Sequence, residues 1–141
     1  MNNLLFLVLA LLATPVARAQ CTDNNIRNQL TSLTEDLNKT GYATTYLTRC
    51  DAVYDGRSRY HDVQVYAGVN YKVIAVCDGS TSGVELEVYD QKGHLLAKRT
   101  PGEALPALAF TPQRSNNVKI KVTLADCQGK PCYYGLRLQA E

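Results

Sequence analysis

The feature that most constrains the fold is an alternation of apolar and polar residues, interrupted by short turns. In VELEVYDQKGHLLAK (84–98), every second residue of the first run is apolar, DQKG supplies turn-forming residues, and a second run follows. Successive side chains of a strand point to opposite faces, so a period of two predicts a strand with one buried face. Two such runs joined by a tight turn predict a β-hairpin.

The same pattern recurs along the chain from residue 43 onward. Further runs of this kind occupy 43–50, 60–67, 70–78, 106–112, 117–126 and 132–140. About eight short strands at this spacing in roughly a hundred residues are typical of a β-sandwich. We therefore predict an all-β fold over residues 42–141, a jelly-roll-like antiparallel β-sandwich. Prolines flank the 106–112 run, which predicts an edge strand.

The pattern of residues 20–41 predicts one N-terminal helix. A period of 3.6 places four apolar residues on one face: Ile26, Leu30, Leu33 and Leu37. The run at 70–78 is apolar at Ile74 and Val76 as well as at the alternate positions, so both of its faces need cover. We predict that the helix packs outside the sandwich, across this strand.

Residues 1–19 are predicted to be a signal peptide. Leu4–Ala13 is an apolar run too short to span a bilayer as a helix, and Ala17 and Ala19 are the small residues that a signal peptidase reads. The mature chain would begin at Gln20 and be exported to the periplasm or the medium. No second apolar stretch could span a membrane, so we expect no membrane insertion.

The five cysteines are expected to form disulfides, because export places them in an oxidising compartment. Cys127 and Cys132 enclose a four-residue turn and are the first predicted pair. A helix of about 24 Å and a returning strand of about 26 Å would bring Cys50 back beside Cys21. This favours Cys21–Cys50, with Cys77 as a buried thiol. The alternative is Cys50–Cys77 with Cys21 free.

Charge and motifs exclude several functional classes. Removal of the signal peptide leaves 14 basic residues against 13 acidic ones, which is no electrostatic footprint for nucleic acid. His61 and His94 are far apart in the sequence, and no nucleophile elbow, zinc-ligand spacing or phosphate loop occurs. Glu85 and Glu87 share the outward face of one strand and are interpreted as solvated. We expect no enzyme, no cofactor and no metal site.

Tyrosine is the unusual component of the composition. The chain has nine Tyr, two Phe and no Trp. Tyr60, Tyr66 and Tyr89 fall on outward positions of their strands and are the candidate ligand surface, because exposed tyrosines suit sugars and protein partners. The alternative is that tyrosines pack under the helix or pair across strands.

The region from about 60 to 139 resembles the bacterial pre-peptidase C-terminal domain. The matching pieces are Ala67-Gly68 with Tyr71, Val88-Tyr89-Asp90 with Gly93, Phe110-Thr111-Pro112, and Tyr134. The resemblance implies a jelly-roll-like sandwich of the kind appended to secreted peptidases. It also implies relatives that bind extracellular matrix or carbohydrate, some with calcium held by Asp residues. In the corresponding loop this chain has Asp78 with Ser80, Ser82 and Glu85.

Two functional hypotheses follow. The first is a secreted or periplasmic non-catalytic binding module for a carbohydrate or an extracellular protein. The alternative is a small periplasmic accessory or inhibitor protein that acts on a protein partner. Glycan binding predicts exposed aromatic residues on one concave face, whereas protein binding predicts a contiguous apolar patch or a mobile loop. We expect a monomer.

Overall fold

The computed structural model describes residues 21, 23–54, 56–79, 83–100, 107–127 and 131–141. These residues form α1 (Asn24–Lys39), β1 (Thr44–Val53), β2 (Ser58–Val65), β3 (Tyr71–Cys77), β4 (Gly83–Tyr89), β5 (Leu95–Arg99), β6 (Ala107–Phe110), β7 (Asn116–Ala125) and β8 (Cys132–Ala140). The predicted signal peptide lies outside the described residues. Within those residues, no helix combines the length and the apolar character needed to cross a membrane.

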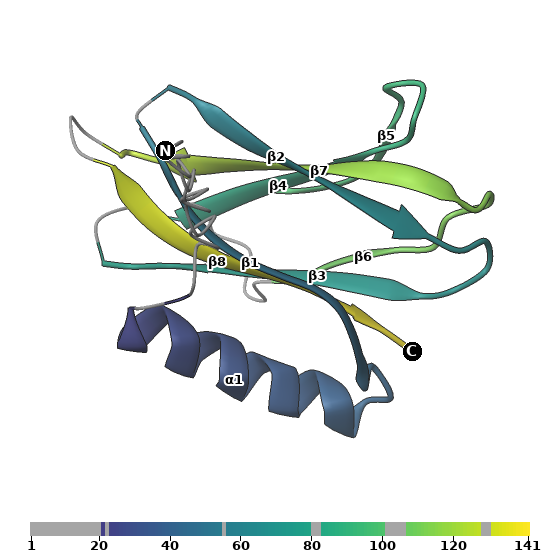
Figure 1. Ribbon diagram of the computed structural model, residues 1–141, viewed down its shortest axis with the longest axis horizontal. Coiled ribbons are helices and arrows are strands. Elements are labelled where there is room, and N and C mark those ends of the chain that lie inside the picture. Colours follow the sequence, from purple (N-terminus) through teal and green to yellow (C-terminus); the bar gives the residue numbers. More distant parts are fainter. Residues whose placement is uncertain (1–20, 22, 55, 80–82, 101–106, 128–130) are drawn as a thin grey trace, which may run out of the picture.

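The strands form two antiparallel sheets that pack face to face (Figure 1). Sheet A has the strand order β1-β8-β3-β6, and sheet B has the order β2-β7-β4-β5. The predicted all-β sandwich with one N-terminal helix is therefore confirmed. The apolar faces of both sheets meet in one core, whose fully buried side chains include Tyr71, Leu86, Ile120, Tyr134 and Leu136. The short strand β6 lies at the edge of sheet A, as its flanking prolines predicted.

The helix is bounded by clear signals at both ends, and it is shorter than the predicted 20–41. The side chain of Asp23 accepts hydrogen bonds from the backbone N–H groups of Asn25 and Ile26, at 2.8 and 3.1 Å, and so caps the helix. After Thr40, Gly41 adopts a φ of +100°, a left-handed conformation that ends the helix and favours glycine.

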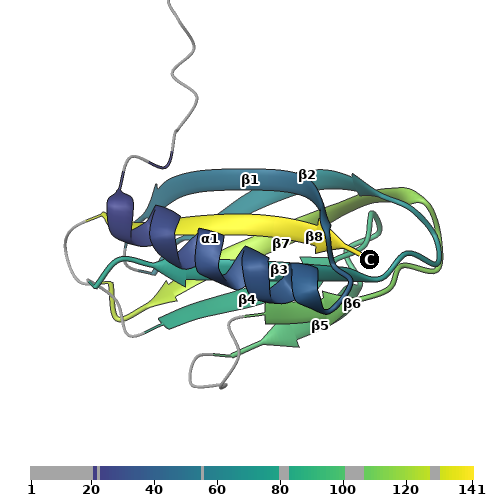
Figure 2. The same cartoon turned by 90° about the horizontal axis from the view of Figure 1, so that it is seen from below.

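Helix α1 lies across the outer face of sheet A, over β8 and β3 (Figure 2). Ile26 and Leu30, which are 2% and 1% exposed, pack with Ile74 and Val76 in a second, smaller core. The predicted cover for the strand at 70–78 is thus confirmed. The helix can approach this closely because β8 has Gly135 beneath it. A Cβ atom there would lie 2.6 Å from Ile26 Cγ2.

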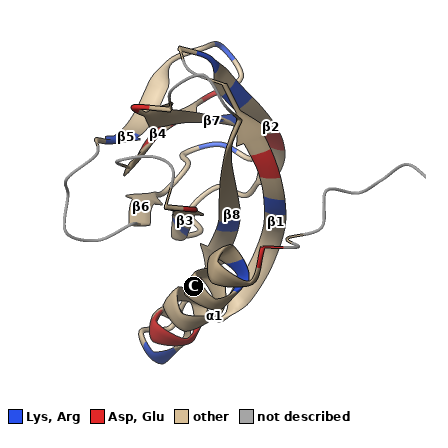
Figure 3. Ribbon diagram, turned by 90° about the vertical axis from the view of Figure 1, so that its left-hand side faces the viewer, with Lys and Arg blue, Asp and Glu red and all other residues tan. Residues whose placement is uncertain are grey.

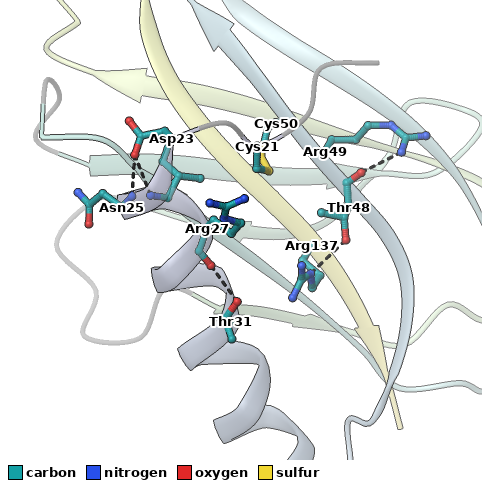
Figure 4. Close-up of a disulfide and its surroundings, with 10 residues drawn as sticks. Cys21, Asp23, Asn25, Arg27, Thr31, Thr48, Arg49, Cys50 and Arg137 are labelled. Atoms are coloured by element: carbon teal, nitrogen blue, oxygen red, sulfur yellow. Dashed lines mark hydrogen bonds between the residues drawn. A yellow bond between two sulfur atoms is a disulfide. The ribbon is translucent and has the colours of Figure 1, made fainter. Parts of the chain in front are cut away.

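Two disulfides staple the fold, in the pairing that the sequence favoured. Cys21, just before α1, is bonded to Cys50 on β1 (Figure 4), and Cys127 is bonded to Cys132 across the turn from β7 to β8. Cys77 is free, and burial raises the pKa of its thiol. Its predicted burial is only partly correct: Cys77 is half-buried, because it is the last residue of β3 and lines a hollow between α1 and β4.

Candidate functional site

Four long polar side chains form one row across the outer face of sheet B. Tyr60 on β2 lies opposite Lys121 on β7, Lys121 lies opposite Glu87 on β4, and Glu87 lies opposite Lys98 on β5. The period of two sends the apolar neighbours of these residues into the core, so the row faces away from it. The next row along the strands places Asp62 beside Lys119, and Lys119 beside Tyr89.

The two rows enclose a shallow hollow that we call the tyrosine–lysine cleft. Its volume is about 270 Å³, and it is lined by Tyr60, Tyr89, Asp90, Gln91, Gly93, Lys119 and Lys121. Tyr60 and Tyr89 come from strands on either side of β7, and the two lysines of β7 lie between them. Two of the three tyrosines predicted as a ligand surface are therefore brought together here.

Glu87 lies at the base of this surface, and its interpretation as a solvated residue was wrong. Its side chain is only 10% exposed, with Lys98 at 3.3 Å and Lys121 at 3.4 Å. Burial alone would raise the pKa of this carboxyl group. Hydrogen bonds from Tyr89 and Lys98, together with the charge of Lys121, outweigh burial and hold the pKa of Glu87 below its ordinary value.

The charged groups of this surface differ in exposure. Asp62, Lys119 and Lys121 reach solvent, whereas the carboxylate of Glu87 is nearly buried although its position on β4 faces outward. Basic and acidic positions lie side by side on β7, β4 and β5 (Figure 3). The side chains of Lys119 and Lys121 are 49% and 28% exposed, far more than that of Glu87. Asp90 is occupied by its own turn, where it accepts hydrogen bonds from the backbone N–H groups of Lys92 and His94 at 2.9 and 2.8 Å. The hydrogen bond from His94 is the main reason that the pKa of Asp90 is lowered.

Tyr66 does not belong to the cleft. Strand β2 ends at Val65, so Tyr66 lies in the following turn, where its backbone N–H donates to the Tyr71 hydroxyl at 2.9 Å. Tyr46 also packs against Tyr71, with 5.6 Å between ring centroids. Tyr46 and Tyr66 are thus exposed together at one end of the sandwich.

Another pair of exposed tyrosines, Tyr54 and Tyr133, lies at the opposite end of the sandwich. Beside Tyr54 is a hollow of about 560 Å³ that Arg57 and Arg59 also line. Sequence reasoning missed Tyr133, although its outward position between the inward Cys132 and Tyr134 was readable from the alternation.

The two histidines occupy unrelated environments. His61 faces inward and forms a 2.6 Å hydrogen bond with the hydroxyl of the fully buried Tyr134. His94 is exposed on the β4–β5 turn, 3.2 Å from Asp90. Burial lowers the pKa of His61 and raises the pKa of Tyr134. These contacts are those of a structural histidine, and Tyr134 is held in its neutral form.

We expect protonation of His61 to destabilise the fold. Its pKa is lower in the folded protein than the ordinary value of 6.5, so the folded state favours the neutral ring. The free energy of unfolding should be fully retained above pH 6.5 and should fall as the pH drops below it, because only the unfolded chain then binds the proton. Urea unfolding at pH 7.5 and 5.5 measures this fall. His61→Gln should reduce it, and an equal fall in that variant would mean that His61 is not its source.

No candidate metal site is present in the described part of the chain. There, no three side chains of the metal-binding types His, Cys, Asp and Glu converge. Ser80 and Ser82, which belong to the loop associated with calcium by the family resemblance, lie outside the described residues.

Comparison with known proteins shows similarity in fold. No protein-family model and no curated protein sequence matches the chain. Among solved structures, the sandwich is similar to PliG from Aeromonas hydrophila, a periplasmic inhibitor of g-type lysozyme. The TM-score is 0.51 and the sequence identity 12%, and the match covers 67% of this chain and 83% of that chain. At this identity the likeness establishes the fold alone.

Proposed function

We propose that this is an exported protein that acts without catalysis, by binding a protein partner, and that it inhibits a lysozyme. The observation that carries the proposal is the similarity of its sandwich to the periplasmic lysozyme inhibitor over most of that inhibitor's length. Two disulfides support export, because such bonds persist in oxidising compartments. A sandwich that two disulfides cross-link is also a rigid scaffold. A preorganised surface loses little conformational entropy when it binds a partner.

The distribution of tyrosines favours a protein partner over a glycan. Exposed tyrosines occur on sheet B at Tyr60, at one end at Tyr46 and Tyr66, and at the other end at Tyr54 and Tyr133. A single sugar-binding face would gather them in one place. Tyrosine spread over the surface of a rigid domain suits protein contacts, in which large amphipathic side chains supply much of the binding energy.

A lysozyme assay tests the proposal directly. The purified mature chain is added to g-type lysozyme acting on bacterial cell walls, and c-type and i-type lysozymes are run in parallel. We expect stoichiometric inhibition of at least one type, with a Kd of about 1 µM or lower. The protein alone should leave the cell walls intact. Full lysozyme activity in all three assays, with no heat of binding by calorimetry, would exclude this function.

A further inference from the structure

We infer that the β4–β5 hairpin contacts the partner protein, and that Leu95 and Leu96 beside its turn enter an apolar recess of that protein. Residues 89–97 are called the leucine hairpin below. The inference rests on the proposed function for the identity of the partner, a lysozyme. For the place and the chemistry it rests on the described residues of β4, the turn and β5.

The leucine hairpin exposes two aliphatic side chains next to each other. In the described part of the chain, the large aliphatic side chains that lie exposed are Leu95 and Leu96, at 51% and 42%. The other large apolar side chains exposed there are tyrosines, whose hydroxyl groups hydrogen-bond water. A leucine has no such group, so this pair gains more than the tyrosines do from being covered by an apolar surface.

A β-bulge accounts for the exposure of both leucines. Val88 lies opposite Ala97 and Tyr89 lies opposite Leu95, so Leu96 has no residue opposite it on β4. In a regular strand, one of two successive side chains faces the core. The extra residue interrupts this alternation, and both side chains stay outside. Bulges are frequent at sheet edges and near functional sites, where they redirect side chains, and β5 is an edge strand of sheet B.

The turn of the leucine hairpin is fixed by its own hydrogen bonds. The Asp90 side chain accepts from the backbone N–H groups of Lys92 and His94, at 2.9 and 2.8 Å. The backbone N–H of Asp90 donates to His94 O at 2.9 Å, and that of Gly93 donates to Asp90 O at 3.1 Å. A turn that is ordered before it binds loses little conformational entropy on association.

The leucine hairpin lies at the end of the sandwich that also exposes Tyr46 and Tyr66. The β4–β5 turn and the β2–β3 turn, which contains Tyr66, are both at the right-hand end in Figure 1. The last residues of β2 and β4 lie opposite Asn116 and Lys119 of β7, so the two strands end about 10 Å apart along the sheet. One partner can cover both turns, because a stable interface buries about 800 Å² on each side.

A recess in a protein suits the leucine hairpin better than a second copy of the chain or a lipid surface. The turn projects from the sandwich (Figure 1), and a symmetric contact between two copies would set one projecting turn against the other. Two leucines supply less apolar surface than one acyl chain, which by itself anchors a protein only weakly. The neighbouring Lys98 is engaged by Glu85 and Glu87, at 3.7 and 3.3 Å, and so adds little attraction to anionic lipid.

Leu95→Ala and Leu96→Ala test the inference on the type of lysozyme that the wild type inhibits. Each should raise the Kd by about 5-fold or more, and the double variant should raise it by about 20-fold or more. Tyr54→Ala is the control, because Tyr54 is 55% exposed and lies at the opposite end of the sandwich. It should change the Kd by less than about 2-fold.

Calorimetry measures the four Kd values, and circular dichroism with thermal melting verifies that each variant is folded. Both leucines are exposed, so we expect the melting temperatures to stay near that of the wild type. An unchanged Kd in the folded double variant overturns the inference. Loss of binding in Tyr54→Ala alone would place the contact at the opposite end.

A second measurement applies if no lysozyme is inhibited, in which case the proposed function fails and the leucine hairpin is still testable. The wild type, the double leucine variant and Tyr54→Ala are immobilised and exposed to a periplasmic extract. Proteins that only the double variant fails to retain are identified by mass spectrometry and purified. A purified protein whose Kd is about 10-fold or more higher for the double variant supports the inference. If no protein distinguishes the variants, the inference is overturned.

Two further measurements test the other occupants. Sedimentation with vesicles of phosphatidylethanolamine and phosphatidylglycerol tests a lipid surface, and analytical ultracentrifugation tests a second copy. We expect the wild type to remain unbound by the vesicles and to sediment as a monomer. Vesicle binding or dimer formation that the double leucine variant loses would assign the leucines to that occupant and overturn the protein recess.

Discussion

Gly135→Val is expected to lower the free energy of unfolding by about 3 kcal/mol, which corresponds to a drop in melting temperature of roughly 10 °C for a chain of this size. Valine suits a strand by conformation, so the cost arises from contact. A Cβ at this position would lie 2.6 Å from Ile26 Cγ2 and 2.7 Å from Leu30 Cδ1. Both side chains are almost fully buried between α1 and sheet A, so they cannot move aside unless the helix moves.

Gly79→Ala is the matched control for this prediction. A Cβ at Gly79 would meet no described atom within 4 Å, and its φ lies outside the left-handed region. We expect its melting temperature to stay within about 2 °C of the wild type. Amide hydrogen exchange shows where the structure is destabilised: Gly135→Val should raise the exchange rates of backbone amides in α1 more than those in β4 or β7. Equal stability of the two variants would mean that α1 is not seated on β8 as the structure has it.

The strands of this protein could be predicted because each carries its own periodic signal. The position of α1 could also be predicted, since Ile74 and Val76 made β3 apolar on its second face and the helix had an unmatched apolar stripe. The turn at Gly68, where φ is +76°, could be predicted as well, but the exact end of β2 could not. The apolar–polar alternation continues through Tyr66, whereas β2 ends at Val65. The backbone N–H of Tyr66 donates to the Tyr71 hydroxyl instead of to a neighbouring strand, and that side-chain contact has no local signature.

The tyrosine–lysine cleft could be predicted only in part, for a related reason. The alternation placed Tyr60 and Tyr89 on outward positions, yet it could not say which strands are neighbours. Sheet B has the order β2-β7-β4-β5, so β7 separates two strands that precede it in the chain. Only this order places Lys119 and Lys121 between the tyrosines. It also explains the burial of Glu87, which two lysines from the strands on either side of it cover.

Removal of the Cys21–Cys50 disulfide is expected to cost more stability than removal of Cys127–Cys132. The two bonds join cysteines 29 and 5 positions apart in the sequence. In the chain-entropy model, the longer loop contributes roughly 3–4 kcal/mol and the shorter about 2 kcal/mol. Double serine variants of each pair test this by urea unfolding. Both are made in a Cys77→Ala background, so that the free thiol cannot exchange with the cysteines that remain.

The two variants should also differ in where the structure loosens. Cys50 packs in the small core with Ile26 and Leu30, and its bond ties the start of α1 to β1 (Figure 4). Loss of that bond should raise hydrogen exchange throughout α1 and leave β7 protected, because the sandwich core does not depend on the helix for its packing. Loss of the Cys127–Cys132 bond should instead raise exchange at the adjoining ends of β7 and β8. If the two variants lose equal stability and exchange alike, loop length is not what sets the contribution of these bonds, and α1 is held by its apolar contacts alone.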